Sequence, residues 1–368
     1  MSNLYIIYGR YYDFNTDSIT IGGVQTYISN LIEVATSIFE KVYVLQMGDS
    51  SSTKLMNGAS INQFGTTTHN VFEKQVYKWI SENDNVEDCL VLFATDSIIF
   101  QKYQFRKSMV IQHGISWDIP KPDSRKSFIR ILLSKTISAY RIIRNLEKTE
   151  KVICVDYNFQ NWFRSLTNKG SEKLIVIPNF TKIAPSIDKP VEPIKIIFAR
   201  RLFPYRGTRV FTEAIIKVLE EFPFVEVTVA GDGPDEPWMR EQLMNFKQVS
   251  FIRYNSNESI QIHSDKHIAV VPTVGSEGTS LSLLEAMSAQ CAVICTDVGG
   301  MTNIVLDRYN GLIVKAGDSI SLYEAIKRII IDKNLRNMIA ANAYSTVKQS
   351  FSKELWQYKW EECLRSFD

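Results

Sequence analysis

The residues from Val270 to Ala289, VVPTVGSEGTSLSLLEAMSA, contain in succession an apolar run, a loop of small residues and a helical pattern. The apolar run ends at Pro272, and apolar residues recur at helical spacing from Leu281 onward. We therefore expect a strand, then a loop, then a helix that begins near Ser280 or Ser282. The first amide groups of a helix have no partner within it, and the helix dipole favours negative charge there. The stretch thus predicts a site for an anion such as a phosphate.

Two glutamates frame the start of this helix, Glu277 in the loop and Glu285 about one helical turn inside it. A single glutamate in a helix usually faces water. Here the pair stands on either side of the predicted anion site, and carboxylates accept hydrogen bonds from hydroxyl groups. The pattern indicates a nucleotide-sugar site. The residues between the glutamates that we assign to it are Gly278, Thr279, Ser280 and Leu281.

These residues resemble the E-x7-E motif of retaining GT-B glycosyltransferases of the family-4 type, the glycosyl transferases group 1. The resemblance implies that Glu277 lies beside the donor sugar and that Glu285 binds the ribose hydroxyls. Many members carry an aromatic residue and then glycine after the first glutamate, whereas this chain has Gly278-Thr279-Ser280. The identity of the sugar therefore does not carry over.

Length and composition are those of a folded protein with two domains. The chain has 368 residues, a formal net charge of +2 and five scattered cysteines. This length allows two separate cores, the charge does not call for nucleic acid, and the cysteines do not indicate a disulfide framework. No secretion signal and no run of about 18 apolar residues is present, so we expect a cytoplasmic protein.

The first half of the chain alternates apolar strands with helical patterns. Leu4 to Tyr8, Lys41 to Met47, Cys89 to Ala94 and Ser108 to His113 fit strands of a buried parallel sheet. A helical pattern follows Gly22 and Gly23, a pair that is more often an ordinary turn. The resemblance implies that these glycines lie near the donor phosphate and the acceptor.

His113 ends one of these predicted strands. A histidine in such a position is usually structural, but ligands of this sheet class bind beyond the carboxyl ends of the strands. Because the family often has a histidine here, we assign His113 to the site, where it would orient the sugar or assist proton movement.

Residues 121–151 are rich in lysine, arginine and apolar side chains, and predict one or two basic amphipathic helices. Such a helix can rest on anionic lipid headgroups. An ordinary packing helix with solvated cations explains the pattern equally well. RNA binding is disfavoured because no aromatic stacking platform accompanies the charge.

The second half begins after a proline-rich linker, Thr181 to Pro193, with a strand from Ile194 to Ala199. Arg201 and Arg206 follow on a bent loop, and we expect both guanidinium groups to converge on one phosphate, although exposed arginines are often only solvated. The loop resembles the family pattern G-R-L-x3-K-G.

Gly231 opens a Gly-Asp-Gly-Pro turn at the end of a further predicted strand. The turn explains these residues without a ligand, but it matches the family's G-D-G-P, and the resemblance implies a position beside the nucleobase.

These patterns predict an α/β protein with two doubly wound, Rossmann-like GT-B domains facing a cleft. We expect an acceptor-binding domain at 1–185, a nucleotide-sugar-binding domain at 186–350 and a C-terminal helix at 351–368 that crosses back to the first domain. The predicted catalytic residues are Glu277, Arg201, Arg206 and His113. The predicted donor-binding residues are Gly22, Gly23, Gly231, Gly278, Thr279, Ser280, Leu281 and Glu285.

The predicted function is transfer of a sugar, with retention of configuration, from a nucleotide-diphosphate donor to a glycan or lipid-linked glycan in surface polysaccharide synthesis. A UDP-sugar is favoured as donor, with no metal or other cofactor, no nucleic acid partner, and a place at the inner face of the cell membrane. The alternatives are a nucleotide-sugar epimerase of the same architecture and a nucleotide-sugar binding module without catalysis.

Overall fold

The computed structural model describes residues 3–20, 22–114, 128–185, 188–275 and 277–367. It separates into two compact units, and each is described by itself. The first unit comprises Met1–His113, Arg125–Ile177 and Trp356–Asp368, and the second comprises Gly114–Ser124 and Pro178–Leu355. The assignment of acceptor binding and donor binding to separate domains stays a prediction.

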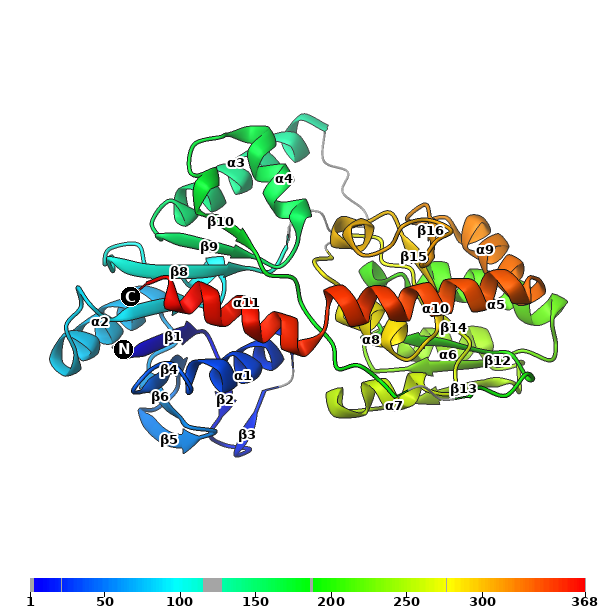
Figure 1. Ribbon diagram of the computed structural model, residues 1–368, viewed down its shortest axis with the longest axis horizontal. Coiled ribbons are helices and arrows are strands. Elements are labelled where there is room, and N and C mark those ends of the chain that lie inside the picture. The colour runs from blue at the N-terminus through cyan, green and yellow to red at the C-terminus, as the bar shows by residue number, and fades with distance from the viewer. Residues whose placement is uncertain (1–2, 21, 115–127, 186–187, 276, 368) are drawn as a thin grey trace. The chain divides into compact units, whose positions relative to one another are not determined.

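The first unit is built on an eight-stranded sheet in the order β10-β9-β8-β7-β1-β4-β6-β5 (Figure 1). Its strands are β1 (Leu4–Tyr8), β4 (Val42–Gly48), β5 (Ser52–Met56), β6 (Ala59–Gly65), β7 (Leu90–Phe93), β8 (Lys107–Gln112), β9 (Lys151–Cys154) and β10 (Leu174–Val176). All neighbours are parallel except β5, which runs antiparallel to β6. A short hairpin of β2 (Tyr12–Asp13) and β3 (Ser18–Ile19) follows β1.

Strand β1 lies at the centre because its side chains are apolar on both faces: Leu4, Tyr5, Ile6 and Ile7 are fully buried. A strand covered on both faces is typical of parallel α/β sheets. The chain places β4 on one side of β1 and β7 on the other, so the strand order reverses at β1. Ligands of such sheets bind at the carboxyl ends beside this reversal.

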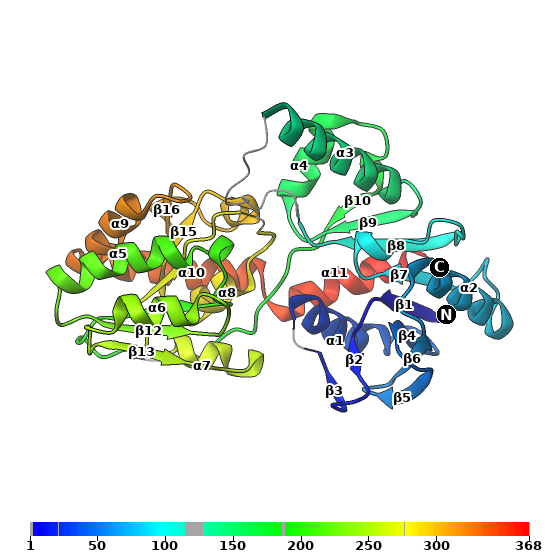
Figure 2. The same ribbon diagram turned by 180° about the vertical axis from the view of Figure 1, so that it is seen from behind.

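The C-terminal helix belongs to the first unit. The helices of this unit are α1 (Gly23–Ala35), α2 (His69–Asn83), α3 (Phe128–Leu146), α4 (Tyr157–Leu166) and α11 (Lys353–Arg365). Figures 1 and 2 both show α11 beside α1, and there Trp360 Nε1 donates a hydrogen bond of 2.9 Å to the hydroxyl of Tyr27. Trp360 is fully buried and Tyr27 nearly so, so α11 closes part of this unit's core.

The second unit contains a six-stranded, fully parallel sheet in the order β13-β12-β11-β14-β15-β16. The strands are β11 (Lys195–Ala199), β12 (Glu226–Ala230), β13 (Val249–Ile252), β14 (Ile268–Val271), β15 (Ala292–Thr296) and β16 (Leu312–Val314). The helices are α5 (Thr208–Glu221), α6 (Glu236–Leu243), α7 (Ser259–His263), α8 (Leu281–Ser288), α9 (Ser319–Ile331) and α10 (Lys333–Ser350).

Helices cover both faces of this second sheet. Ile196 and Phe198 of β11 pack in one apolar cluster with residues of α5 and α9, whereas Ile197 and Ala199 pack in another with residues of α8. Successive strand residues point to opposite faces, which explains the division. Helix α10 contributes to both clusters, Ile339 to the first and Ala343 and Val347 to the second.

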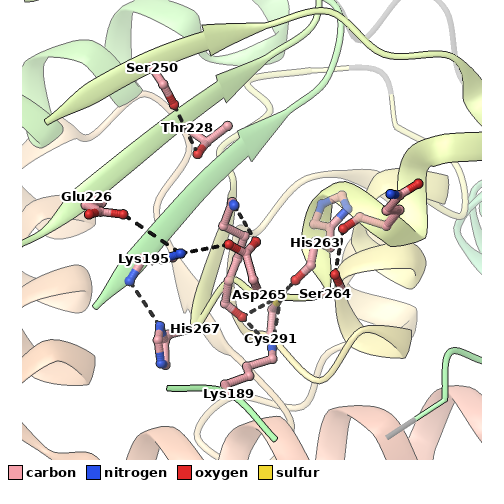
Figure 3. A network of polar contacts seen from close by, with 12 residues as sticks. Lys189, Lys195, Glu226, Thr228, Ser250, His263, Ser264, Asp265, His267 and Cys291 are labelled. Atoms are coloured by element: carbon pink, nitrogen blue, oxygen red, sulfur yellow. Dashed lines mark hydrogen bonds and ion pairs between the residues drawn. The ribbon is translucent and has the colours of Figure 1, made fainter. Parts of the chain in front are cut away.

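Residues of the predicted linker are tied to the amino ends of the strands of this sheet (Figure 3). Lys189 Nζ donates to the carbonyl oxygens of Gln290, at 2.8 Å, and of Lys266. His267 Nε2 lies 2.7 Å from the carbonyl of Pro190, and its Nδ1 accepts from the amide of Lys195 at 3.0 Å. A carbonyl only accepts, so Nε2 of His267 carries the hydrogen. These bonds lie at the edge opposite the strands' carboxyl ends.

Replacing Trp360 by alanine is expected to destabilise the first unit by about 3–5 kcal/mol, because loss of a fully buried indole leaves a cavity and removes one hydrogen bond from the Tyr27 hydroxyl. Urea unfolding followed by circular dichroism measures this loss. Tyr358→Ala, on the exposed side of the same helix, is the matched control and should cost roughly 0.5 kcal/mol or less. Equal losses for the two variants would contradict the placement of α11.

Candidate active site

Two neighbouring strands of the second sheet end where a polar cluster gathers. The strand order reverses at β11, which lies between β12 and β14. Arg200 directly follows β11, and Thr273 stands two residues beyond the end of β14. Because carboxyl ends of parallel strands meet at one edge, these side chains come together at the reversal, where ligands of such sheets bind.

Glu277 is the centre of this cluster. Its Oε2 accepts from Arg200 Nη2 at 2.9 Å, from Arg206 Nη1, and from the Thr273 hydroxyl at 3.0 Å. Arg200 Nη1 in turn donates to the Thr273 hydroxyl. The side chains of Arg200, Glu277 and Arg206 are 5%, 9% and 19% exposed, so Arg206 is the most accessible of the three.

The two guanidinium groups decide the charge of Glu277. Burial by itself raises the pKa of a carboxyl, but Arg200 and Arg206 outweigh it and hold the pKa of Glu277 below its usual range. The cluster therefore contains two cations and one anion. Its net charge of about one positive unit suits an anionic ligand.

The structure brings Arg200, rather than the predicted Arg201, to this cluster. Arg201 is exposed, and its guanidinium lies 5.4 Å from the centre of the Phe203 ring. Consecutive residues at a strand end point to opposite sides, so only one of two adjacent arginines can face Glu277. The predicted convergence of Arg201 and Arg206 on one anion is thus replaced by that of Arg200 and Arg206.

Two glycines let neighbouring loops approach the backbone of this cluster. Gly231 has φ +133°, and a Cβ there would lie 2.2 Å from the carbonyl oxygen of Arg200. Gly299 has φ +55°, and a Cβ would lie 2.0 Å from the carbonyl oxygen of Glu277, which also accepts from the amide of Gly300 at 2.9 Å. Larger residues would displace Arg200 or Glu277. This contact accounts for Gly231 without a ligand.

The loop from Gly278 leads directly into α8, which begins at Leu281 as predicted. Ser280 is the N-cap residue and is buried, but among the described residues its side chain makes no capping hydrogen bond. Thr279 is also buried, and its carbonyl accepts from Asn179 Nδ2 at 2.7 Å. The loop is therefore held while the first amides of α8 keep their capacity to bind an anion.

Glu285 lies on α8 in a partly buried position. Burial raises the pKa of its carboxyl to about 7, and the Ser259 hydroxyl opposes this in part. Tyr254 lies close enough to respond to three charges: after burial, Glu285 and Asp232 raise the pKa of its phenol and Arg200 lowers it. The phenol of Tyr254 thus responds both to Arg200 of the Glu277 cluster and to Glu285.

Sequence reasoning missed Arg200, Thr273 and Tyr254. All three stand within two residues of a strand's carboxyl end. A rule that takes every polar residue in that position, rather than those of a family motif, would have found them.

The first unit holds the other predicted site residues. His113 Nε2 lies 2.9 Å from the carbonyl of Ala94, so this nitrogen carries the hydrogen, and the ring packs edge-on against Tyr27 at 5.5 Å. Burial lowers the pKa of His113 to about 4, which the Ala94 carbonyl opposes in part. The ring is neutral at pH 7. Gly22 is the N-cap of α1 and Gly23 its first residue.

A cavity of about 460 Å³ lies within the first unit, at the carboxyl ends of β1, β4 and β7. Its lining residues are Tyr8, Gly9, Arg10, Thr20, Gln25, Met47, His69, Thr95, Ser97 and Ile98. His69 Nε2 is buried and has no hydrogen-bond partner among the described residues. Hydroxyl, amide, imidazole and guanidinium groups in one hollow can bind a polyol.

Two further searches cover the described residues. Within them, no three histidine, cysteine, aspartate or glutamate side chains gather so as to hold a metal ion. Nor does any helix in these ranges have the length and apolar character that crossing a bilayer requires.

Residues 179–346 match the sequence profile of a family described as glycosyl transferases group 1. This region of the chain is similar to the group 1 glycosyl transferases. The match confirms the group 1 resemblance that the residues around Glu277 predicted. The matched region includes Arg200, Arg206, Glu277 and α8.

Two curated relatives are similar to this chain over more than residues 179–346. The phosphatidyl-myo-inositol mannosyltransferase of Mycolicibacterium smegmatis is 23% identical, over 92% of this chain and 87% of its own. The Escherichia coli UDP-Gal:alpha-D-GlcNAc-diphosphoundecaprenol alpha-1,3-galactosyltransferase is 25% identical, over 64% of this chain and 65% of its own.

Solved structures establish the fold. HepE of Anabaena in complex with UDP superposes with a TM-score of 0.74 at 17% identity, covering 100% of both chains. Sucrose-phosphate synthase of Thermosynechococcus elongatus gives 0.75 at 16% identity, covering 100% of this chain and 99% of its own. The predicted α/β GT-B fold is confirmed.

Replacing Arg200 by methionine is expected to lower the free energy of unfolding of the second unit by about 3 kcal/mol, because it removes one partner of a buried ion pair. Arg201→Met removes an exposed guanidinium and should change it by roughly 0.5 kcal/mol or less. Urea unfolding of the two variants measures the difference. A larger loss for Arg201→Met would show that the adjacent arginines exchange places in solution.

Proposed function

We propose that this protein moves a sugar from a UDP-sugar to a glycan or lipid-linked glycan, with retention of configuration and without a metal ion, in surface polysaccharide synthesis. One observation carries the proposal: Arg200, Arg206 and Glu277 meet at the strand reversal of the second sheet. The family's activity supports transfer. Retention, metal independence and the pathway are our inference.

The donor is proposed to bind across this cluster and α8. The amides at the start of α8 and the accessible Arg206 would hold the diphosphate, and Glu285 would accept hydrogen bonds from the ribose hydroxyls. Gly278 to Leu281 would line the donor. HepE is solved in complex with UDP and with UDP-glucose, and the E. coli relative is named for UDP-Gal, which supports a UDP-sugar.

The reaction would break the bond between the anomeric carbon and the β-phosphate oxygen. An acceptor hydroxyl oxygen then bonds to that carbon on the same face, and its proton passes to the departing phosphate. Negative charge grows on the diphosphate, and a prearranged guanidinium stabilises it without reorganisation. Arg200 keeps Glu277 ionised, and this carboxylate would stabilise the positive charge that develops on the sugar.

The arginines would take the part that a divalent cation takes in metal-dependent transferases. A guanidinium stays charged throughout the accessible pH range and binds phosphate through paired donors. Arg206 combines this capacity with accessibility, whereas Arg200 is buried and serves to hold Glu277.

The acceptor is proposed to bind in the cavity of the first unit. Its polar lining and the orphaned His69 Nε2 suit the hydroxyl groups of a sugar. His113, neutral at pH 7, would orient the sugar through Nδ1 rather than act as a cation. A lipid-linked acceptor is supported by two relatives whose names contain diphosphoundecaprenol or diphospho-undecaprenol.

Peripheral contact with the inner face of the cell membrane is proposed through residues 121–151, in a cytoplasmic protein. Residues 121–127 lie outside the described residues, and α3 supplies Phe128–Leu146. The name of the M. smegmatis relative contains a lipid, phosphatidyl-myo-inositol, and this supports activity at a membrane surface.

Incubating the protein with a panel of UDP-sugars in the presence of EDTA is expected to release free sugar slowly, and faster transfer should follow when an acceptor is added. Arg206→Gln should lower the rate by about 100-fold, the usual cost of losing one donor to a developing oxyanion. Arg209→Gln, an exposed arginine at the start of α5, should retain the rate. Chromatography of the products measures both.

Other outcomes of the same experiment point to other functions. Epimerised UDP-sugar would indicate an epimerase, and binding without turnover would indicate a binding module. Restoration of activity by manganese only after EDTA treatment would overturn metal independence, and a product of inverted configuration, read by NMR, would overturn retention.

The affinity for UDP is expected to rise as the pH is raised towards about 7 and to level off above it. Ribose hydroxyls prefer the ionised carboxylate, so binding lowers the pKa of Glu285 and releases a proton wherever the free enzyme holds it protonated. Calorimetry in two buffers of different ionisation enthalpy measures the number of protons that are released when UDP binds. Glu285→Gln should remove both the proton release and the rise, and persistence of either would exclude the ribose role.

A further inference from the structure

We infer that α3 and the hollow at its C-terminal end form a site for the phosphate headgroup of an anionic phospholipid in a bilayer. This inference rests on the proposed membrane contact and adds the side chains that make it and the lipid that they select. It follows from three features of the first unit: an exposed apolar stripe, a border of cations and a basic hollow.

The apolar stripe of α3 consists of five large side chains that remain exposed. Their exposed fractions are 65% for Ile129, 53% for Leu132, 57% for Leu133, 50% for Ile137 and 61% for Tyr140. At about 100° per residue, Ile129, Leu133 and Tyr140 fall within about 40° of one another. One face of α3 is therefore apolar and turned to solvent, whereas a packing helix turns its apolar face to the core.

Three of the four cations of α3 lie along one border of this stripe, and Lys135 lies on the other side. Arg130, Arg141 and Arg144 fall about 60° to 120° round the helix from Ile129, next to the apolar side chains. An apolar face bordered by cations is the pattern of a helix that lies in the plane of a membrane interface. Between Ile129 and Lys148, Glu147 is the sole acidic residue, so the charge is complementary to an anionic surface.

The hollow has a volume of about 500 Å³. Its lining residues are Gln101, Tyr140, Arg141, Arg144, Asn145 and Lys148. Tyr140 belongs to both the stripe and the hollow, so the two features are continuous. Within the described part of the chain, the acidic partner of its three cations is Glu147, whose Oε2 lies 4.0 Å from Arg144 Nε.

One of these cations, Lys148, is held by a neutral group. Lys148 Nζ donates to Gln101 Oε1, and Gln101 Nε2 donates to the Ile99 carbonyl at 2.9 Å and to Asn145 Oδ1 at 3.3 Å. Gln101 therefore anchors Lys148 without neutralising it. A phosphate in the hollow would receive donors from Arg141, Arg144 and Lys148, and the acyl chains of the same lipid layer would meet Ile129 and Leu133.

Sedimentation with vesicles tests this site on the full chain in the absence of donor. Binding is expected to vesicles of phosphatidylcholine mixed with phosphatidylglycerol and not to phosphatidylcholine alone. Arg141→Gln/Arg144→Gln should weaken binding by about 30-fold, since each cation near the surface contributes about tenfold or slightly less. Ile129→Ser/Leu133→Ser should also weaken it, because both side chains are exposed and their loss leaves the core intact.

The control pair is Lys74→Gln/Lys78→Gln on the exposed side of α2, which removes the same charge from the same unit. Binding by this variant should stay within about threefold of the unaltered chain, since charges away from the surface are screened. An equal loss of vesicle binding in both double variants would show that binding depends only on the net charge of the protein, and this would overturn the inference.

Three other results would also overturn it. Release of bound protein by inorganic phosphate at constant ionic strength would mean that the hollow takes free phosphate. A concentration-dependent dimer that Ile129→Ser/Leu133→Ser abolishes, seen by light scattering, would assign the stripe to a second copy of the chain. Equal binding to vesicles with and without phosphatidylglycerol would show that the site does not recognise the anionic headgroup.

The vesicle measurement is independent of the proposed transfer reaction. If sugar release from UDP-sugars is normal and the headgroup preference is absent, only this inference fails. If the preference is present and no donor is cleaved, only the proposed function fails.

Discussion

The structure of the second unit depends on one buried interaction, the pairing of Glu277 with Arg200 and Arg206 at the strand reversal of the sheet. A charge in this position is expensive to bury alone, and each member of the cluster removes that cost for the others. Thr273 satisfies both Arg200 and Glu277, and Gly231 and Gly299 let two further loops close on the same backbone. The packing around β11, β14 and α8 therefore converges on a group whose chemistry suits a phosphate ligand.

The three charged groups of this cluster differ in solvent accessibility, and we therefore assign them different roles. Arg200 is almost wholly buried and already has two partners, so it holds Glu277 in place and ionised. Arg206 retains more exposure than the other two, so in the proposed site it is the guanidinium that a diphosphate would reach. Because Glu277 arranges both arginines before any ligand is present, little reorganisation is needed when negative charge develops.

The pattern of apolar residues was sufficient to predict most of the strands, since strands buried on both faces appear in the sequence as continuous apolar runs. Leu4 to Tyr8 is a strand with the predicted bounds, and the strand predicted at Ile194 to Ala199 begins one residue later, at Lys195. Strands β5 and β6 were missed because β5 is an edge strand with alternating polar side chains, and β6, which lies between β5 and β4, contains Ser60, Asn62 and Gln63 among its apolar residues. A signal was present in Asn57-Gly58, which joins them with positive φ at both residues, as a tight hairpin requires.

The sequence by itself determined the parallel α/β class, the helix that starts beside Glu277 and the family resemblance, because apolar periodicity and a motif contained in one loop are local properties. Only the tertiary structure decided that Arg200, not Arg201, faces Glu277, since a strand's pleat turns adjacent side chains to opposite sides. It also decided the partners of Tyr254, Thr273 and Trp360, which come from segments far apart in the chain. Whether a cation is solvated or a glutamate is ionised depends on burial and on such distant neighbours, and these arise only when the chain is folded.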